Sequence, residues 1–201
     1  MARTQAPDYE QRREAIVEKA AQLFASMGFK GASVSDLAAA CETSKSLIYY
    51  YYPSKEDILN AVMSSHIDQL LADVEKVMEE DDTAPKRLCR LLHAFMAHYV
   101  GAADRQKVLL NELNNLPDEN RAVIVRKQRM IIDVVQSLLV GIHPELSTDG
   151  PRARAQTMLL FGMINWTKTW FDPKGSLSAD DVADMVFQHA LAPLTLEHSF
   201  S

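Results

Sequence analysis

The apolar residues of this chain recur every three or four positions, the spacing that places side chains on one face of a helix. Between about residues 8 and 27, one such stripe consists of Ile16, Ala20, Leu23, Phe24 and Met27. Gly28 follows at the position where a left-handed C-terminal cap ends a helix. We therefore expect a first helix that buries one face.

A second, shorter helix is predicted to begin after Ser33. Ser33 and Asp36 have the spacing of a capping box, in which the serine hydroxyl accepts from the Asp36 amide and the carboxylate returns to the cap. The inner face of this helix carries Leu37 and Ala38. Glu42 lies in the short turn that follows.

The third predicted helix, residues 44–52, has two different faces when drawn at about 100° per residue. The inner arc carries Leu47, Ile48, Tyr51 and Tyr52, and the outer arc carries Lys45, Ser46, Tyr49 and Tyr50. Pro53 ends the helix because the residue before a proline avoids helical geometry. Tyrosine and lysine bind phosphate, and short polar side chains near a helix start reach base edges. The segment is predicted to be the recognition helix of a helix-turn-helix, although an ordinary solvated face is the alternative for the outer arc.

Helical spacing then continues from Ser54 to about Glu80, a length of about 38 Å at 1.5 Å per residue. Further helices are expected at about 85–100, 104–114, 117–140, 151–171 and 178–191, the last capped by Ser178 with Asp181. No segment alternates like a strand. We predict an all-α chain with a three-helix helix-turn-helix DNA-binding domain at 8–53. A ligand-binding and dimerisation domain of about six helices follows at 54–201, connected by the helix of about 54–80.

The composition supports a folded core, because 47% of the 201 residues are apolar. The net charge is −6, and the first sixty residues hold seven Lys and Arg against eight Asp and Glu. A basic surface for DNA is therefore only local, formed by Arg3, Arg12, Arg13, Lys45 and Lys55. DNA binding by so small a surface is expected to be highly sensitive to salt.

Cysteine content and hydropathy indicate the compartment. Cys41 and Cys89 are too few for a disulfide framework, which fits a reducing environment. Residues 1–7 lack a hydrophobic run after their charge, and no segment approaches eighteen consecutive apolar residues. We expect a cytoplasmic protein without a membrane partner.

Catalytic and metal-binding motifs are not evident. His93 and His98 are five residues apart, about 140° around a helix, and the two cysteines have no metal-ligand spacing. The chain has no phosphate loop, nucleophile elbow or pair of catalytic carboxylates. We expect no metal, no cofactor and no enzymatic activity. An enzyme or small-molecule carrier that uses the N-terminal helices as a scaffold is the alternative from another class.

The tyrosine run at 49–52, followed after Pro53 by Ser54 and Lys55, is a specific pattern. It is accompanied by Leu23-Phe24, Gly28-Phe29, Ser33-Val34, Leu37-Ala38, Ser44-Lys45, Ile48 and Ile58-Leu59. With these residues the N-terminal third resembles the TetR/AcrR family of bacterial transcriptional regulators. The predicted DNA-binding residues are Ser33, Ser35, Ser44, Lys45, Ser46, Tyr49, Tyr50 and Lys55.

Two positions depart from the family pattern. The turn reads Cys41-Glu42-Thr43 where the family often has Ala-Gly-Val, and Ser46 stands where it often has glycine. Glu42 puts a carboxylate near the turn that faces DNA. The loss of two glycines is expected to shift the recognition helix slightly.

Residues 158–171 are apolar nearly all round, which is typical of a helix buried between neighbours. Trp166 and Trp170 share a face, and Gly162 leaves room for another helix. Asn165 needs a partner from a neighbouring helix, a second subunit or a ligand, because a buried unpaired amide costs a few kcal/mol. Core or dimer packing is the simplest interpretation. The family resemblance implies a homodimer formed through the helices at about 151–171 and 178–191, with an effector site inside the body.

The pattern Gly-Met-Ile-Asn-Trp-Thr at 162–167, with Asn111-Glu112-Leu113 upstream, is similar to TetR-family regulators that sense acyl-CoA thioesters, especially the phenylacetyl-CoA-responsive type. A lining of Met and aromatic side chains suits an acyl or phenyl group. Basic residues at 126–129, Arg87 and Arg105 either bind the CoA phosphates or form a solvated face. The predicted effector-binding residues are Phe95, Tyr99, Asn111, Met130, Met163, Asn165, Trp166, Thr169 and Trp170.

Together these features predict a ligand-responsive repressor of a fatty-acid or phenylacetate-like degradation pathway, released from its operator by an acyl-CoA thioester. A TetR-type regulator of efflux that senses another lipophilic molecule is the alternative. The expected partners are double-stranded operator DNA, a small-molecule effector and a second copy of the chain.

Overall fold

The computed structural model describes residues 7–193, and every regular element in that range is helical, as predicted. The chain packs into two compact units, crossing between them after Asp68, Gly101 and Arg126. The first unit therefore includes residues 102–126, which the sequence assigns to the second domain, and the domain division at 53/54 stays a prediction. No helix within the described range is long and apolar enough to cross a membrane.

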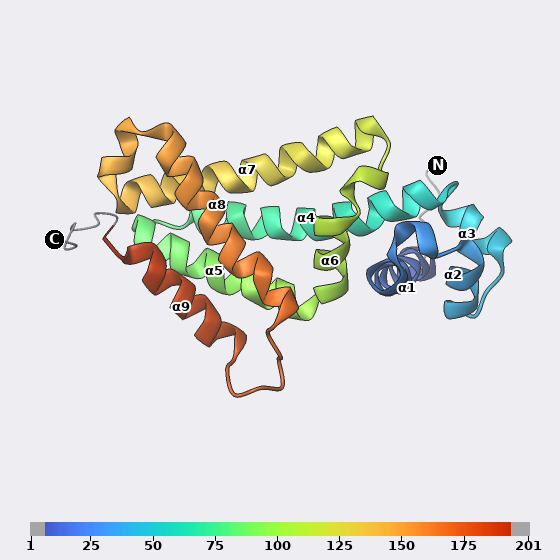
Figure 1. The fold of residues 1–201 in the computed structure, drawn as a ribbon. Helices are drawn as coiled ribbons and strands as arrows, with labels where there is room; N and C mark the ends of the chain where they lie inside the picture. Colours follow the sequence, from blue (N-terminus) through green and yellow to red (C-terminus); the bar gives the residue numbers. More distant parts are fainter. Residues whose placement is uncertain (1–6, 194–201) are drawn as a thin grey trace. The chain divides into compact units, whose positions relative to one another are not determined.

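The first unit contains the predicted N-terminal helices (Figure 1). Its elements are α1 (Pro7–Gly31), α2 (Val34–Ala40), α3 (Lys45–Tyr51), the start of α4 (Lys55–Glu79), α6 (Ala103–Asn111), the 3₁₀ turn η1 (Leu113–Asn115) and the start of α7 (Asp118–Ile142). Both α4 and α7 continue into the second unit.

Local hydrogen bonds explain where α2 and α3 begin. Ser33 Oγ accepts from the Asp36 N–H at 3.2 Å, and the Asp36 carboxylate accepts from the Ser33 N–H at 2.8 Å. The predicted capping box is therefore confirmed. Ser44 Oγ caps α3 by accepting from the Leu47 N–H at 3.2 Å. These bonds satisfy amides that have no partner inside the helix.

Gly28 interrupts α1 with φ 73° and ψ 158°, a conformation that residues with a Cβ rarely adopt. The sequence predicts that the helix ends here, but α1 resumes after the break and continues to Gly31. The kink lets Phe29 pack against Phe24, with ring centroids 5.4 Å apart. Both rings are buried in the first unit.

Arg105 joins α6 to α1 within the first unit. Its guanidinium donates to Glu18 at 2.9 and 3.2 Å and to Ser65 Oγ at 3.2 Å, and it also pairs with Glu14. The arginine side chain is 9% exposed, whereas both carboxylates are half exposed or more. A buried guanidinium requires such partners, because an unpaired buried charge is strongly destabilising.

The second unit has a core between α5 and α9, which lie side by side (Figure 1). Its elements are the end of α4, α5 (Ala84–Gly101), the rest of α7, η2 (Pro144–Thr148), α8 (Gly150–Trp166), η3 (Thr167–Thr169) and α9 (Ala179–Leu191). The buried side chains of the two packed helices are Leu88, Leu91, Leu92, Phe95, Met96, Val182, Ala183, Val186 and Ala190. The predicted capping box at Ser178 is also present.

Two predicted helix ends in the second unit are wrong. The helix expected over 151–171 ends at Trp166 and tightens into the 3₁₀ turn η3, a common ending of an α-helix, in which the Thr167 hydroxyl donates to the Ile164 carbonyl at 2.5 Å. Gly141, expected to close α7, lies inside it. A Cβ at Gly141 would lie 3.0 Å from Ala84 Cβ, so the glycine permits close packing of α7 and α5.

Candidate nucleic-acid interface and effector site

The two predicted faces of the 44–52 segment are present on α3. Lys45, Ser46, Tyr49 and Tyr50 are exposed, with Tyr49 at 47% and Tyr50 at 70%. Ile48 and Tyr52 are buried, and Leu47 and Tyr51 are half-buried. The outer face therefore offers one ammonium, two phenols and a serine hydroxyl on a single short helix. Groups of these kinds are the ones that contact phosphate oxygens and base edges in protein–DNA complexes, so the predicted DNA contact of this face remains a prediction.

The inner tyrosines fix α3 against α1. Tyr51 packs on Tyr9 with ring centroids 4.9 Å apart. The Tyr52 hydroxyl donates to the Arg13 carbonyl at 3.5 Å, and the Arg13 guanidinium lies 5.3 Å from the Tyr52 ring centroid. Burial raises the pKa of Tyr52, and the nearby Arg13 opposes that rise. Four consecutive tyrosines thus lie in two environments, and the two inner ones position the helix.

Ser33, Ser35 and Ser44 are exposed at the starts of α2 and α3. Ser33 and Ser44 are occupied as helix caps, and the Ser33 hydroxyl also donates to Asp36 at 2.6 Å. The Ser33 hydroxyl and backbone N–H hold the pKa of the Asp36 carboxyl below its usual value. A contact from either cap to DNA remains a prediction, and it has to coexist with the capping bond.

Glu42 has φ 51° in the turn between α2 and α3, within the left-handed region. Glycine occupies this region without a steric penalty, whereas other residues pay about 1–2 kcal/mol. Glu42 stands where the related pattern often has glycine, so the departure noted in the sequence has a backbone consequence. The conformational cost was not apparent from helical spacing alone.

Lys55 has partners within the protein. Its ammonium donates to the Phe29 carbonyl and lies 4.2 Å from the Phe29 ring centroid. Lys55 is half-buried at the start of α4. Its predicted contact with DNA therefore competes with a structural role that joins α4 to the end of α1.

The local basic surface is smaller than the sequence predicts. Arg13 is half-buried against tyrosine rings and pairs with Glu10 at 3.7 Å. Arg12 is exposed on α1, and Arg3 lies outside the described residues. On α3 itself, Lys45 is the one basic residue, and it is exposed.

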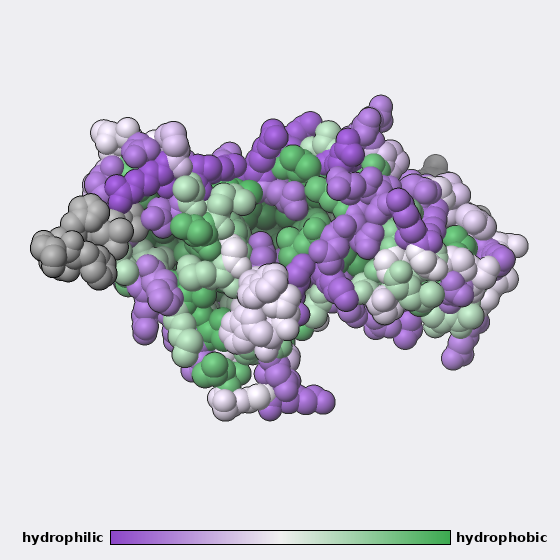
Figure 2. Space-filling model, in the orientation of Figure 1, coloured by the Kyte–Doolittle hydropathy of each residue, from purple (hydrophilic) through white to green (hydrophobic). Residues whose placement is uncertain are grey.

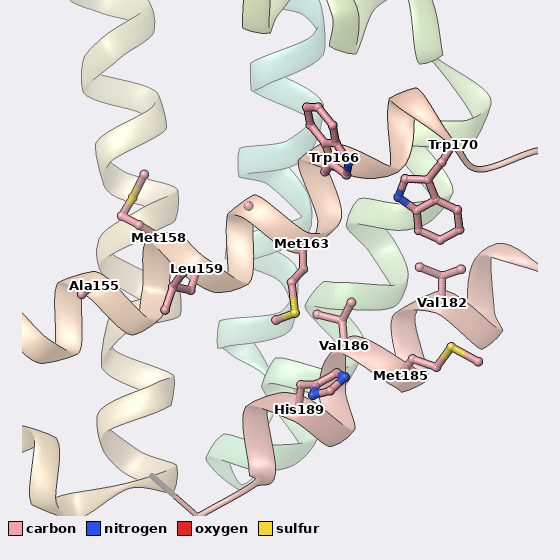
Figure 3. Close-up of a pocket in the computed structure, with 11 residues that line it drawn as sticks. Ala155, Met158, Leu159, Met163, Trp166, Trp170, Val182, Met185, Val186 and His189 are labelled. Atoms are coloured by element: carbon pink, nitrogen blue, oxygen red, sulfur yellow. The ribbon is translucent and has the colours of Figure 1, made fainter. Parts of the chain in front are cut away.

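An apolar groove of about 870 Å³ lies between α8 and α9 in the second unit (Figure 3). Its most exposed large side chains include Met158 at 49%, Leu159 at 63%, Trp166 at 65% and Trp170 at 54%. Figure 3 shows Met163 reaching from α8 toward Val186 and His189 of α9. Figure 2 shows apolar surface over the part of the second unit where α8 and α9 lie. The sequence predicts burial all round for 158–171, and within one chain this is wrong.

The nine predicted effector residues do not form one site. Met163, Trp166 and Trp170 line the open groove. Phe95 is buried on α5, with its ring centroid 6.1 Å from that of Phe161. The remaining residues are the half-buried Tyr99 and Asn165, and the exposed Asn111, Met130 and Thr169. Asn111 belongs to the first unit and the other eight to the second.

Two basic residues suggested for CoA phosphates have partners in the protein. Arg105 is held by Glu14 and Glu18, and Arg87 donates to the Glu80 carbonyl. Arg126 and Arg129 are exposed on α7. Thr169, predicted to contact the effector, donates its hydroxyl to the Trp166 carbonyl at 2.7 Å.

Comparisons with known proteins agree with this architecture. The family model for bacterial regulatory proteins of the tetR family matches residues 16–62, and the model for the tetracyclin repressor-like C-terminal domain matches residues 81–194. A TetR-family transcriptional regulator from Bordetella parapertussis 12822 has a similar structure, with a TM-score of 0.86 and 37% identity over 89% of this chain and 93% of that chain.

Two further relatives have named roles. The HTH-type transcriptional repressor KstR2 from Mycolicibacterium smegmatis is 26% identical over 92% of this chain and 91% of its own length. The structure of AibR in complex with isovaleryl coenzyme A and operator DNA has a TM-score of 0.76 and 25% identity over 89% of this chain and 97% of that chain.

The C-terminal family model alone covers more than half of the chain. The members of this family are DNA-binding transcriptional regulators rather than enzymes, so the enzyme and carrier alternatives are set aside. The helix-turn-helix with its exposed α3 face and the all-helical body lead to the same assignment: the chain belongs to the TetR family of bacterial transcriptional regulators.

Proposed function

We propose that this regulator is a homodimeric repressor of a fatty-acid or aromatic-acid degradation pathway, released from its operator by an acyl-CoA thioester. The observation that carries DNA binding is the division of α3 into a packed face and an exposed face with Lys45, Ser46, Tyr49 and Tyr50. In the dimer, two copies of α3 enter successive major grooves of a near-palindromic operator, about one helical turn apart.

A second copy of the chain is proposed to cover the groove on α8 and α9. Exposed Met, Leu and Trp side chains line it, and contiguous apolar patches of this kind are rare on monomeric proteins. Aromatic residues and methionine are enriched in protein interfaces. A Cβ at Gly162 meets no atom within 4 Å in this chain, so α8 of a partner is able to approach there. Met163, Trp166 and Trp170 are accordingly assigned to the dimer interface rather than to the effector.

The effector is proposed to bind in the body near Phe95, which packs on Phe161 between α5 and α8. Tyr99 lies one turn further along α5 and is half-buried, so it supplies a polar group at the edge of an apolar interior. AibR, which matches nearly its full length to this chain, is described with isovaleryl coenzyme A and operator DNA. This relative supports an acyl-CoA as the effector class.

Transmission to the DNA-binding helices is proposed to run through α6 as well as through the long helix α4. The α5 helix ends at Gly101 and α6 begins at Ala103, so a displacement of α5 passes directly to α6. Arg105 on α6 holds Glu14 and Glu18 of α1. An effector that displaces α5 therefore moves α1, against which Tyr51 and Tyr52 pack, and lowers operator affinity by about 1–3 kcal/mol.

The test measures operator affinity with and without acyl-CoA. An operator is selected from a random duplex library by the wild-type protein, and binding is followed by fluorescence anisotropy. Acetyl-, isovaleryl-, octanoyl- and phenylacetyl-CoA are added, with the free acids and coenzyme A as controls. We expect one ester to weaken operator binding by about 5- to 150-fold and to raise the melting temperature. No response to any CoA ester contradicts the effector proposal, and a response to the free acids instead favours the efflux-type regulator.

A further inference from the structure

Three metal-ligating side chains of different chemistry meet between α5 and α9 in the second unit. Cys89 and His93 lie four residues apart on one face of α5, and Asp184 faces them from α9. One ligand atom of each residue lies within 4.8 Å of the others. The cysteine and histidine are half-buried, whereas the Asp184 side chain is 58% exposed and leaves a route from solvent.

His93 is held by a carboxylate on each side. Its Nε2 lies 2.9 Å from Asp184 Oδ1, and its Nδ1 lies 2.9 Å from Asp180 Oδ1. Metal-binding histidines commonly donate their second ring nitrogen to a carboxylate, which fixes the orientation of the ring. Asp180 therefore has the position of an outer partner, a carboxylate that holds the histidine without contacting the metal ion. Asp184 has the position of a direct ligand.

The geometry needs little change to accept an ion. Around a tetrahedral zinc ion with bonds of 2.0–2.3 Å, neighbouring ligand atoms lie about 3.3–3.5 Å apart. The His93 and Asp184 atoms have to separate by a few tenths of an ångström, and the Cys89 sulfur has to approach by at most about 1.3 Å. Side-chain rotation on two packed helices accommodates both movements.

We propose that Cys89, His93 and Asp184 bind one Zn²⁺ per chain, with water at the fourth position. Thiolate, imidazole and carboxylate together favour Zn²⁺ over Mg²⁺ or Ca²⁺, which take oxygen ligands. The ion joins α5 to α9 and thereby stiffens the helix that is proposed to carry the dimer groove. The sequence predicts no metal because His93 and His98 do not share a helix face, and because the two cysteines lack the spacing of metal ligands. The informative pair is Cys89 with His93, and Asp184 joins them only after folding.

Cobalt titration of the full-length protein tests this site. Chelator-treated protein is titrated with Co²⁺, whose near-ultraviolet charge-transfer band reports a thiolate ligand and whose visible bands report tetrahedral geometry. We expect one equivalent per chain, bleaching by Zn²⁺, and a higher melting temperature with Zn²⁺. Cys89→Ser should abolish the charge-transfer band, and His93→Gln and Asp184→Asn should each weaken Co²⁺ binding by tenfold or more.

Two control variants make the outcome decisive. Cys41→Ser changes the other cysteine, which lies in the first unit, and should keep the band. Asp180→Asn should keep the spectrum but lower the affinity by about 10- to 100-fold, as expected for an outer partner. Circular dichroism checks that each variant is folded. The absence of a charge-transfer band in wild type, or its persistence in Cys89→Ser, overturns the proposal and leaves His93 with its two aspartates as an ion-pair cluster.

Discussion

Two exposed surfaces of this protein are both rich in aromatic side chains but differ in the groups around them. On α3, Tyr49 and Tyr50 lie beside Lys45 and Ser46, so every exposed aromatic residue there has a hydroxyl and polar neighbours. On α8 and α9, the exposed aromatic residues are tryptophans flanked by methionine, leucine and valine. The polar groups of the first surface can replace hydrogen bonds to water by hydrogen bonds to phosphate oxygens. The second surface is stabilised by a partner only when water is excluded from its apolar side chains.

The difference teaches that exposure alone does not define a binding surface. In the free protein, hydration of a tyrosine and lysine face carries little free-energy penalty. Contact of water with the apolar side chains that line a groove of about 870 Å³ is unfavourable. We therefore assign α3 to a polyanionic partner that binds and leaves. For the groove we propose a partner that stays bound, a second copy of the chain.

The largest effect is expected from a charge in the groove. Met158→Asp places an unpaired carboxylate in the proposed interface. The free energy of dimerisation should therefore weaken by about 2–4 kcal/mol, which raises the dissociation constant of the dimer by about 30- to 1,000-fold. Sedimentation equilibrium measures the change. Met27→Asp is the matched control, because Met27 is 51% exposed on α1 and Met158 is 49% exposed. Equal dimerisation of the two variants would remove the groove from the interface.

The α3 surface is tested by Tyr49→Ala and Lys45→Ala. Each should weaken operator binding by about 1–3 kcal/mol while the protein remains dimeric, and Lys45→Ala should reduce the slope of log affinity against log salt by about 0.9 for each lysine removed. Anisotropy titrations at several salt concentrations measure both effects. Lys30→Ala removes an exposed lysine of α1 and should change neither. Wild-type operator affinity in both α3 variants would contradict the proposal that this face of α3 contacts the operator.

Coupling between the effector and α3 is tested at Arg105. Arg105→Met removes the bonds to Glu14 and Glu18, so the effect of the active CoA ester on operator affinity should shrink by about 0.5–2 kcal/mol. Arg121→Met is the control, since the Arg121 side chain is more exposed than that of Arg105 and pairs with Asp118 of its own helix at 2.7 Å. An unchanged response in Arg105→Met would exclude this route of transmission.

The smallest effect concerns the turn before α3. Glu42→Gly relieves the left-handed conformation but also gains entropy in the unfolded chain, so the net gain in unfolding free energy should be below about 1 kcal/mol. Glu42→Gln removes the charge without relieving the backbone. Both variants should bind DNA more tightly at low salt, but only Glu42→Gly should melt at a higher temperature. The same melting temperature for both variants would show that the backbone cost is negligible.

Features that depend on neighbouring residues were predictable from the sequence. The capping boxes at Ser33 and Ser178 and the two faces of α3 follow from spacing alone, because their partners lie within one or two helical turns. The helix-turn-helix and the all-α class follow from the same periodicity. These features locate the candidate DNA surface without any knowledge of long-range packing.

Features that depend on distant contacts were not predictable. Lys55 meets Phe29, and Arg105 meets Glu18, only after folding brings separate helices together. Periodicity also cannot tell whether an all-round apolar segment is covered by its own chain or by a partner, which is why the exposure of Trp166 was missed. Asp184 likewise joins Cys89 and His93 only when α9 packs against α5, so the sequence shows two of the three side chains of this cluster but not the third.

The most direct test of the two-surface account is the stoichiometry of the operator complex, measured by sedimentation velocity with a fluorescent operator. The account predicts two wild-type chains per operator. It also predicts that Tyr49→Ala binds the operator about 1–3 kcal/mol more weakly with the dimer intact, and that Met158→Asp loses binding because the dimer is broken. Binding of Met158→Asp as a single chain with wild-type affinity would contradict the central claim that the apolar groove pairs two copies so that their α3 helices read DNA together.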